Sequence, residues 1–483
     1  MDRAPARPPP RAVAALKNDD DGASTTSRAS ASAVAVVDAL GWSSYQWRLF
    51  FVCGLCIAAE SAEVNLLSFL TVECAREWSL TGAAVDHVAG SVFAGEAVGC
   101  ALFGLLADAR GRRPAFALGT ILVAGFGLGT AFARNLGEMM ALGFGVGLGI
   151  GGFSVPYDLL CEFCPNSARG VVMMALWIWW TFGSFMVLLL ASVMLESQGW
   201  RMLCVYCALP AVVATFGVLL VDESPHWLVI KGRRDEADAI LRRAATMNGV
   251  ELGEYELEPE ELGTLDVRVL FRDGNGFRTT LIWICQFAQT FVYYGIVLYL
   301  PRAFVQINGS SAADASPSRY PYWALVLSCS GELAASVALL FLVQRFTRSQ
   351  LLSSSFLMFA LTFPFVVMDV RDAYMVVFAM LARMAATNAG NISWLASPEA
   401  YPTHVRATGH GWANLFARFG AVVTTYCAGW HDHHGVAILY AFVALIGSFA
   451  GYMLPPGVMP GSEPTDRFDA HGRLFRQAKQ NVD

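Results

Sequence analysis

Charged residues are scarce in this sequence. Asp, Glu, Lys and Arg make up 15% of its 483 residues, whereas hydrophobic residues make up 55%. A soluble domain carries about 25% charged residues, so a water-exposed globular fold is excluded and a lipid bilayer is the expected solvent. The net charge of −6, with basic residues spread over loops, also argues against a nucleic-acid partner.

The sequence also lacks the short motifs of common catalytic and ATP-binding sites. It contains no G-x-S-x-G, H-E-x-x-H or Walker pattern, which argues against an enzyme and against a pump driven by a P-loop ATPase. Three cysteine pairs have C-x-x-C spacing but no further ligands nearby, so we predict no metal site and no cofactor. They are better explained as small residues at helix interfaces. The pairs are Cys53/Cys56, Cys161/Cys164 and Cys204/Cys207.

Long apolar runs, by contrast, are abundant. Each is about 20 residues long, enough to span the hydrocarbon core as a helix. Twelve runs lie near 48–72, 86–107, 115–133, 137–160, 171–195, 202–221, 279–300, 322–343, 350–368, 374–396, 408–430 and 435–454. An even number places both chain ends on one side of the membrane. Nineteen Lys and Arg lie in the loops and tail on that side and six on the other, so the positive-inside rule places both termini in the cytosol.

A nine-residue pattern, E-x-x-P-x-x-x-R followed by a small residue, occurs twice. The copies at 162–170 and 399–407 lie 237 positions apart, and Gly183 and Gly420 repeat the same offset. A membrane chain built from two related halves is typical of secondary transporters.

The repeat and the apolar runs together predict the domain organisation. The connection between the halves contains Ala237, Ile240, Leu241 and Ala244 at helical spacing, which predicts an amphipathic surface helix. We expect a disordered cytosolic tail at 1–41, six helices in 42–222, a cytosolic linker at 223–277, six helices in 278–456 and a cytosolic tail at 457–483.

The loop after the second run reads GLLADARGRR at 104–113. It resembles the signature loop of the major facilitator superfamily, G-x-L-a-D-r-x-G-R-R. Gly104 permits close helix approach and Gly111 a tight turn, while Asp108 and Arg112 can form charged hydrogen bonds. The resemblance implies a cytosolic gate that holds one side shut and releases as the halves rock. The predicted gate comprises Gly104, Asp108, Gly111, Arg112, Glu162, Arg169, Glu399 and Arg406.

Two positions weaken the second copy of this loop. Gln344 stands where the family usually has aspartate, and Thr347 where it usually has glycine, although Arg345 and Arg348 remain. We therefore expect the second half to gate less tightly.

DESPHWL at 222–228 resembles an element shared by sugar porters, organic-ion transporters and the synaptic-vesicle-protein branch, from which Asp222 and His226 depart. Two further segments narrow the resemblance to one branch. FVYYG at 291–295 looks like the organic-ion and vesicle-protein pattern, and CEF at 161–163 is similar to synaptic-vesicle-protein-related transporters. The similarity covers about residues 42–455. It implies an all-α membrane protein with twelve transmembrane helices in two pseudo-symmetric six-helix halves. Gly143 stands where the fourth helix usually begins with arginine, so a proton-coupling role of that arginine is not carried over.

Ionisable residues inside the apolar runs are candidates for a site, because they are costly in a bilayer unless they line a cavity or path. Glu60 and Glu63 lie on one helix face and match an Asp-x-x-Glu pair of the branch, which predicts a shared cavity that binds a cation or exchanges a proton. The alternative is that one of them bridges to Arg383 or Arg418. The predicted cavity residues are Glu60, Glu63, Trp180, Tyr294, Glu332, Arg383, Asn388 and Asn391.

Two other acidic residues receive different predictions. Glu96 lies in the small-residue segment 95–99, where we expect it to pair across helices rather than bind a solute. Asp158 lies one turn before Glu162 and is assigned to the gate.

The function predicted is secondary active transport of a small polar or charged organic solute by alternating access. Five intramembrane carboxylates against two arginines favour an organic cation or a zwitterion, with proton coupling as an option. The alternatives are a facilitative sugar or polyol uniporter and a non-transporting receptor or trafficking protein of the same fold. We expect a monomer in the plasma membrane or an endomembrane vesicle, whose partners are the solute, protons and lipid.

Overall fold

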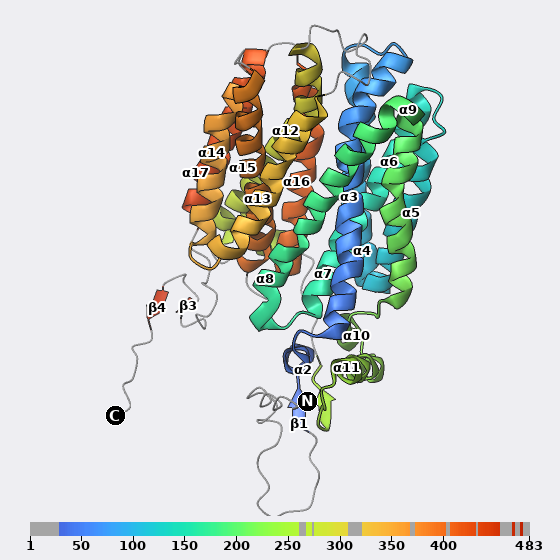
Figure 1. The fold of residues 1–483 in the computed structure, drawn as a ribbon. Helices are drawn as coiled ribbons and strands as arrows, with labels where there is room; N and C mark the ends of the chain where they lie inside the picture. The colour runs from blue at the N-terminus through green and yellow to red at the C-terminus, as the bar shows by residue number, and fades with distance from the viewer. Residues whose placement is uncertain are drawn as a thin grey trace, which may run out of the picture.

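The computed structural model describes residues 29–259, 267–272, 275–307, 321–367, 372–401, 406–430, 433–454, 466–468 and 474–476. Within these ranges long helices stand side by side in two bundles, one coloured blue to green and one yellow to red (Figure 1). Predictions about residues 1–28 and about most of 457–483 lie outside the described residues.

The N-terminal half contains a helix that carries two membrane passes. Gly199 has a φ of 77°, which is outside the helical region and favours glycine, so it divides α9 into two passes. The elements of this half are α3 (Ser44–Glu77), α4 (Ala83–Arg110), α5 (Arg112–Thr130), α6 (Leu136–Ile150), η1 (Gly151–Phe153), α7 (Ser154–Glu162), α8 (Asn166–Leu176), α9 (Ile178–Gly217) and η2 (Val218–Leu220).

The C-terminal half follows a short 3-10 turn, η3 (Val267–Phe271). Its helices are α12 (Asn275–Ile307), α13 (Tyr322–Leu342), α14 (Arg348–Val367), α15 (Asp372–Glu399), α16 (Arg406–Ala428) and α17 (His433–Met453). Two short strands, β3 (Asp466–Phe468) and β4 (Leu474–Arg476), pair antiparallel after the last helix.

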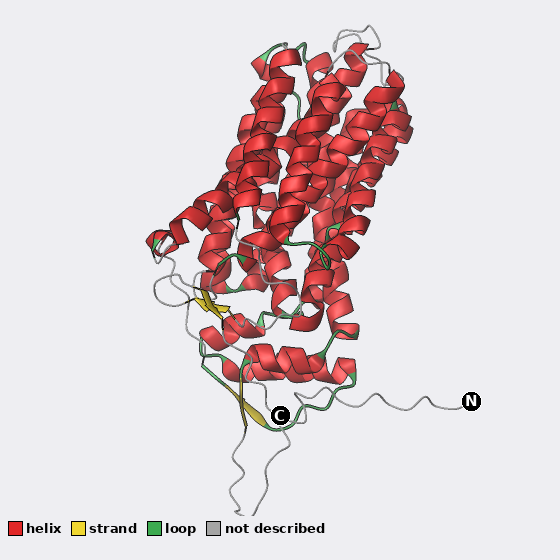
Figure 2. Cartoon of the chain, turned by 90° about the vertical axis from the view of Figure 1, so that its left-hand side faces the viewer, coloured by secondary structure: helices red, strands yellow, loops and turns green. Residues whose placement is uncertain are grey.

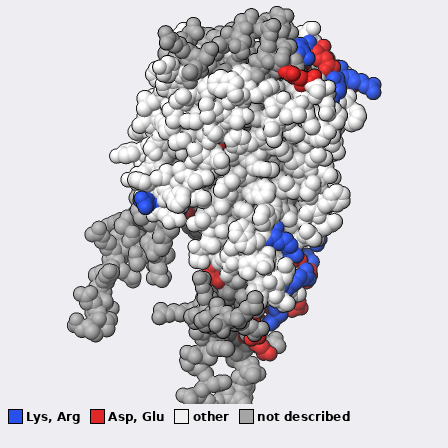
Figure 3. Space-filling view, in the orientation of Figure 1, with Lys and Arg blue, Asp and Glu red and all other residues white. Residues whose placement is uncertain are grey.

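The described helices account for the twelve predicted passes. Ten stretches are long and apolar enough to cross a membrane, and one of them, Asn166–Leu220, holds two passes because Gly199 divides it. α16 is not among the ten, since polar residues such as His410 and Arg418 lower its hydropathy, but its length matches its neighbours. On the visible face, uncharged side chains cover the middle and charged ones gather near the two ends, as a bilayer requires (Figure 3).

Small residues let α4 and α6 pack closely. A Cβ atom on Gly95 would overlap the Phe144 carbonyl oxygen, and one on Gly99 would overlap that of Leu148. The predicted small-residue packing element is therefore confirmed. This packing sets the rotation of α4, and the side chain of Glu96, which lies between these glycines, pairs with Arg418 on α16.

A unit that we call the cap, residues 29–41 and 222–257, lies beyond one end of the bundles (Figure 2). β1 (Ala29–Ala31) pairs parallel with β2 (Tyr255–Leu257). The predicted amphipathic helix is present as α11, with Ala237, Leu241 and Ala244 buried. The helices of the cap are α2 (Ala33–Leu40), α10 (Pro225–Ile230) and α11 (Arg234–Asn248).

The prediction of a disordered tail over 1–41 is wrong for residues 29–40. Val36, Val37 and Leu40 are buried, and α2 packs against α10 and α11. Ser32 caps the start of α2 by accepting a hydrogen bond from the Ala35 backbone at 3.2 Å. The apolar surface that orders this segment comes from a region some 200 residues later in the chain, which is why composition suggested disorder.

The cap holds the starts of three N-terminal helices. Asp38 accepts hydrogen bonds from the backbone and side-chain nitrogens of Asn166 at 2.6 and 2.7 Å, which caps α8. Glu223 accepts from the Arg112 backbone nitrogen at 2.8 Å at the start of α5. Asn248 accepts from the Tyr45 backbone nitrogen at 3.0 Å at the start of α3. These contacts tie helix ends of the N-terminal half into one frame.

Candidate functional site

A cavity lies between the two halves. The N-terminal half contributes one carboxylate and two tryptophans, and the C-terminal half contributes amides, hydroxyls, aromatic rings and one guanidinium. The residues that line it are Glu60, Trp177, Trp180, Gln289, Thr290, Tyr293, Tyr294, Thr387, Gly390, Asn391, Trp394 and Arg418. Its walls therefore offer charge of both signs together with flat apolar surfaces.

Arg418 on α16 supplies the positive charge of the cavity, and its carboxylate partners come from the other half. It forms a short ion pair with Glu96 on α4 and a longer one, 3.7 Å, with Glu60 on α3. It also donates a hydrogen bond to the Tyr294 hydroxyl at 3.3 Å. The predicted cross-helix pairing of Glu96 is confirmed, and the structural-bridge alternative holds for Glu60.

Arg383 on α15 is paired differently, because its acidic partner lies in its own half. It donates to Glu332 on α13 at 2.6 Å, and both side chains are buried. Tyr293 donates its hydroxyl hydrogen to the same carboxylate oxygen at 2.8 Å. Glu332 and Arg383 therefore stand behind the cavity wall, and Tyr293 joins them to it.

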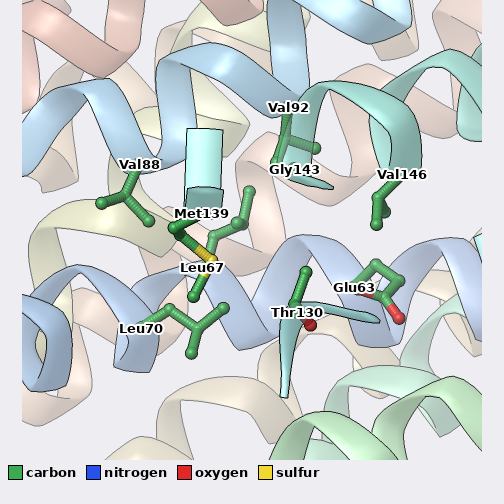
Figure 4. Close-up of a pocket in the computed structure, with 9 residues that line it drawn as sticks. All are labelled: Glu63, Leu67, Leu70, Val88, Val92, Thr130, Met139, Gly143 and Val146. Carbon is green, nitrogen blue, oxygen red and sulfur yellow. The ribbon is translucent and has the colours of Figure 1, made fainter. Parts of the chain in front are cut away.

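Glu63 lies in a different pocket from Glu60, so the predicted shared cavity is absent from the described residues. Its pocket is enclosed within the N-terminal half and is lined by α3, α4, α5 and α6 (Figure 4). Most of the lining is apolar, and the Oε1 atom of Glu63 has no hydrogen-bond partner in the described part of the chain. Residues three apart on a helix point about 60° apart, which is enough to send one side chain toward the partner half and the other into its own bundle.

The two predicted asparagines also differ in their position relative to the cavity. Asn391 lines the cavity, and its side-chain nitrogen lies 3.5 Å from the Ser336 hydroxyl. Asn388 is buried one turn away and is not among the described lining residues. Of the eight predicted cavity residues, those that line it are Glu60, Trp180, Tyr294 and Asn391.

Sequence reasoning identified only Tyr294 on α12 and missed the other polar residues of that helix. Gln286, Gln289, Thr290 and Tyr293 are polar or amphipathic residues that recur every three or four positions within an otherwise apolar helix, and all are buried. That periodicity marks one face of the helix and could have identified the wall of the cavity.

Aromatic rings of the two halves contact one another at the cavity. Trp394 on α15 lies 5.6 Å from Trp177 and 5.8 Å from Tyr157, measured between ring centroids. These contacts join residues of the two halves and are of a kind that can open and close without breaking a charged pair.

The gate residues of the first half lie together. Arg112 pairs with Asp108 at 2.7 Å and with Glu162 at 3.6 Å, and Gly111 has a φ of 110° that suits glycine. Arg169 donates to the Cys164 carbonyl oxygen at 3.2 Å. Gly104 does not match the expectation of close helix approach, since a Cβ atom there would meet open space.

In the second half, Arg348 takes the place that Arg112 has in the first. It pairs with Glu399 at 3.0 Å and donates to the Val343 carbonyl oxygen at 2.8 Å. Gln344, where aspartate is usual, instead donates to the Leu340 carbonyl oxygen at 3.2 Å. Arg406 begins α16, and its side chain lies outside what the structure describes.

The described residues contain no group of three or more His, Cys, Asp or Glu that could hold a metal ion. The site offers ion pairs, amides and aromatic faces instead, which suit binding of an organic molecule.

Residues 41–457 match the model of one protein family, described as sugar (and other) transporter. The chain belongs to this family. Its fold is that of the major facilitator superfamily: the partially occluded inward-open form of the xylose transporter XylE from E. coli superposes with a TM-score of 0.68 at 18% identity, over 86% of this chain and 99% of that one. The family consists of membrane transporters and not of enzymes, so the multi-pass membrane protein predicted is confirmed.

Curated relatives lie in the predicted branch. The synaptic vesicle 2-related protein of Xenopus laevis is 28% identical over 81% of this chain and 74% of its own length. The niacin transporter NiaP of Acinetobacter baylyi is 26% identical over 85% and 94%. Organic cation/carnitine transporter 7 of Arabidopsis thaliana is 26% identical over 89% and 95%. The resemblance to the synaptic-vesicle-related and organic-ion branch is confirmed.

Proposed function

We propose that this chain is a secondary active transporter that moves a small charged organic solute through the cavity between its halves by alternating access. The observation that carries the proposal is the cavity lining, which combines the Glu60–Arg418 ion pair with aromatic rings from both halves. A site shared by two halves changes its accessibility when the halves rock, and that is the requirement for alternating access.

The wall favours a zwitterion or an organic cation. A solute ammonium group is attracted by Glu60 and by the faces of Trp177, Trp180 and Trp394, and a solute carboxylate by Arg418. Relatives named as carriers of niacin and of organic cations or carnitine support small charged organic solutes as the class to test.

Proton coupling is the second part of the proposal, and Glu63 is its candidate residue. The Oε1 atom of Glu63 is buried without a hydrogen-bond partner in the described residues, which is costly for a charged carboxylate, and proton uptake lowers that cost. Because the Glu63 pocket is separate from the solute cavity, Glu63→Gln is expected to remove the dependence of uptake on a proton gradient while solute binding remains. Unchanged gradient dependence would exclude Glu63 from coupling.

A sugar or polyol carrier is the second candidate function. Gln289, Thr290, Thr387 and Asn391 form a wall of amides and hydroxyls that can hydrogen-bond a polyhydroxylated solute. The charged pair in the same cavity favours the first candidate, because Glu60 and Arg418 can attract the charged groups of a solute.

The setting of the protein completes the proposal. We infer a monomer with both termini in the cytosol, which places the cap and both gates on the cytosolic side. The vesicle-related relatives support an endomembrane vesicle, with the plasma membrane as the alternative.

The test is uptake by the purified protein in liposomes. Labelled nicotinate, carnitine, choline and xylose are offered with and without an imposed proton gradient, and empty liposomes are the control. Saturable uptake of a charged solute that follows the gradient is expected. Uptake of xylose alone would replace the first candidate with the second, and no uptake by folded protein would favour a receptor or trafficking role.

A further inference from the structure

A closed ring of buried polar groups joins the two halves beside the cavity. It comprises Ser61, Asn65, Trp180, Tyr293, Glu332 and Arg383, and we call it the polar ring. Each member exposes 8% of its surface or less. The members come from α3, α9, α12, α13 and α15.

The polar ring crosses between the halves at two bonds. Trp180 Nε1 donates to the Tyr293 hydroxyl at 2.5 Å, and Arg383 Nη2 donates to Asn65 Oδ1 at 2.9 Å. Within the C-terminal half, Tyr293 and Arg383 meet at Glu332 Oε1. Trp180 and Tyr293 of the first bridge line the cavity, whereas Asn65 and Arg383 of the second are not among the described lining residues.

Asn65 closes the ring on the N-terminal side. Its side-chain nitrogen donates to the Ser61 carbonyl oxygen at 2.9 Å, and the Ser61 hydroxyl donates to the Trp180 carbonyl oxygen at 2.6 Å. An amide serves here because it accepts from Arg383 and donates to Ser61 at the same time. Aspartate would keep the first contact and lose the second, and alanine would lose both.

We propose that the polar ring couples occupancy of the cavity to separation of the halves, and that Asn65 is the positioning residue that sets this coupling. A movement that opens the cavity must break at least one of the two bridges. A solute that displaces the Trp180–Tyr293 hydrogen bond weakens the bond from Tyr293 to Glu332. The bond from Arg383 to Asn65 weakens in turn, because hydrogen-bonded groups in a buried network depend on one another. The inference rests on the proposed rocking of the halves and adds the residues that control it.

The fold can tolerate loss of the Asn65 bridge. Arg383 keeps its ion pair with Glu332 when Asn65 is removed, so no unpaired charge is left in the membrane. The expected effect is therefore on the balance between closed and open arrangements. A hydrogen bond to a charged group changes such a balance by about tenfold or more.

Single-molecule fluorescence energy transfer in nanodiscs measures that balance without a solute. Keto amino acids at Met247 in the cap and Phe346 between α13 and α14, both exposed, carry the dyes and avoid the 11 native cysteines. The wild type is expected to show one dominant distance. Asn65→Ala should raise the minor population about tenfold, and Asn65→Ser serves if the alanine variant does not fold.

The decisive comparison is a double-mutant cycle. Trp180→Phe removes the indole N–H and keeps the aromatic face, and it should raise the minor population as Asn65→Ala does. The minor population of the double variant should be little larger than that of either single variant, because both substitutions act on the polar ring. Ser68→Ala is the matched control: Ser68 is buried on the same helix, and its hydroxyl donates to the Asn65 carbonyl oxygen within α3.

Two results would overturn the polar ring as a coupling element: an Asn65→Ala distribution equal to that of the wild type or of Ser68→Ala, or single effects that multiply in the double variant. The liposome uptake experiment tests the proposed transport separately from the polar ring. No uptake of any solute, with the ring effect intact, would overturn the proposed transport and leave the coupling of the halves in place.

Discussion

Each of the two halves has an equivalent arginine–glutamate ion pair at its cap-side end. The two pairs differ in the groups that support the arginine. Arg112 in the first half reaches Glu162 and also Asp108, which lies one turn away on the same segment. Arg348 in the second half reaches Glu399 and, in place of an aspartate, the carbonyl oxygen of Val343. The long-range arginine–glutamate pair is thus the element common to both repeats, and the local aspartate is an addition.

The cap adds hydrogen bonds to the first gate. Trp227 donates to the Asp108 carbonyl oxygen at 3.0 Å, and Glu223 accepts from the backbone at the start of α5. The first gate is therefore part of a larger hydrogen-bonded frame. The expected weaker gating of the second half stays a prediction, which the following variants test.

The largest effect is expected for Arg112→Gln. It leaves Asp108 and Glu162 without the charge they share, and breaking a partly buried ion pair in this way costs about 3 kcal/mol. Thermal unfolding in detergent should show the loss, together with reduced uptake in liposomes. Arg113→Gln, at an exposed neighbour, is the control, and equal effects of the two variants would contradict the role of Arg112.

Arg348→Gln should have a smaller effect on stability, about 2 kcal/mol. Its partner Glu399 is 36% exposed at the side chain and can be hydrated once the arginine is gone. The same unfolding measurement applies, with the exposed Arg345→Gln as control. A loss greater than that of Arg112→Gln would reverse the comparison of the two gates.

Asp108→Asn converts the first gate toward the second. The long-range pair with Glu162 remains, and the aspartate side chain is 40% exposed, so the expected loss of stability is only about 1 kcal/mol. Turnover should slow while the order of preferred solutes stays the same. A changed solute preference in competition uptake would show that Asp108 acts on the cavity and not on the gate.

Gln344→Asp is the reciprocal change and the smallest effect. It places a carboxylate four residues before Arg348 and should stabilise the protein by about 0.5 kcal/mol or less. Gln344→Asn gives the matching neutral control in the unfolding assay. A destabilised aspartate variant would indicate that Arg348 cannot reach residue 344, in the turn before α14, while it holds Glu399.

Much of the fold could be predicted because its signals are local in the sequence. Apolar runs of membrane length mark each pass, and the repeat at Glu162 and Glu399 marks the two halves. Two helices needed more than mean hydropathy: α9 lies in one long apolar stretch that Gly199 divides into two passes, and α16 is not among the ten apolar stretches.

For the candidate site, the sequence predicted several of the lining residues but not how the charged residues pair. Glu60, Trp180, Tyr294 and Asn391 do line the cavity, but the partner of each charged group could not be assigned. Glu63 turns into its own bundle, and Glu96 turns out to hold Arg418. A small difference in helix rotation decides such cases, and rotation is set by packing such as that of Gly95 and Gly99 against α6.

The sequence by itself determined that this chain spans a membrane, that it consists of two related halves and that it resembles a transporter branch. These properties depend on hydrophobicity and spacing, which are present before folding. The tertiary structure alone decided which carboxylate meets which arginine, that residues 29–40 join the cap, and that the polar ring closes. Each of these contacts joins residues far apart in the chain, and only the packed arrangement of the helices brings them within hydrogen-bonding distance.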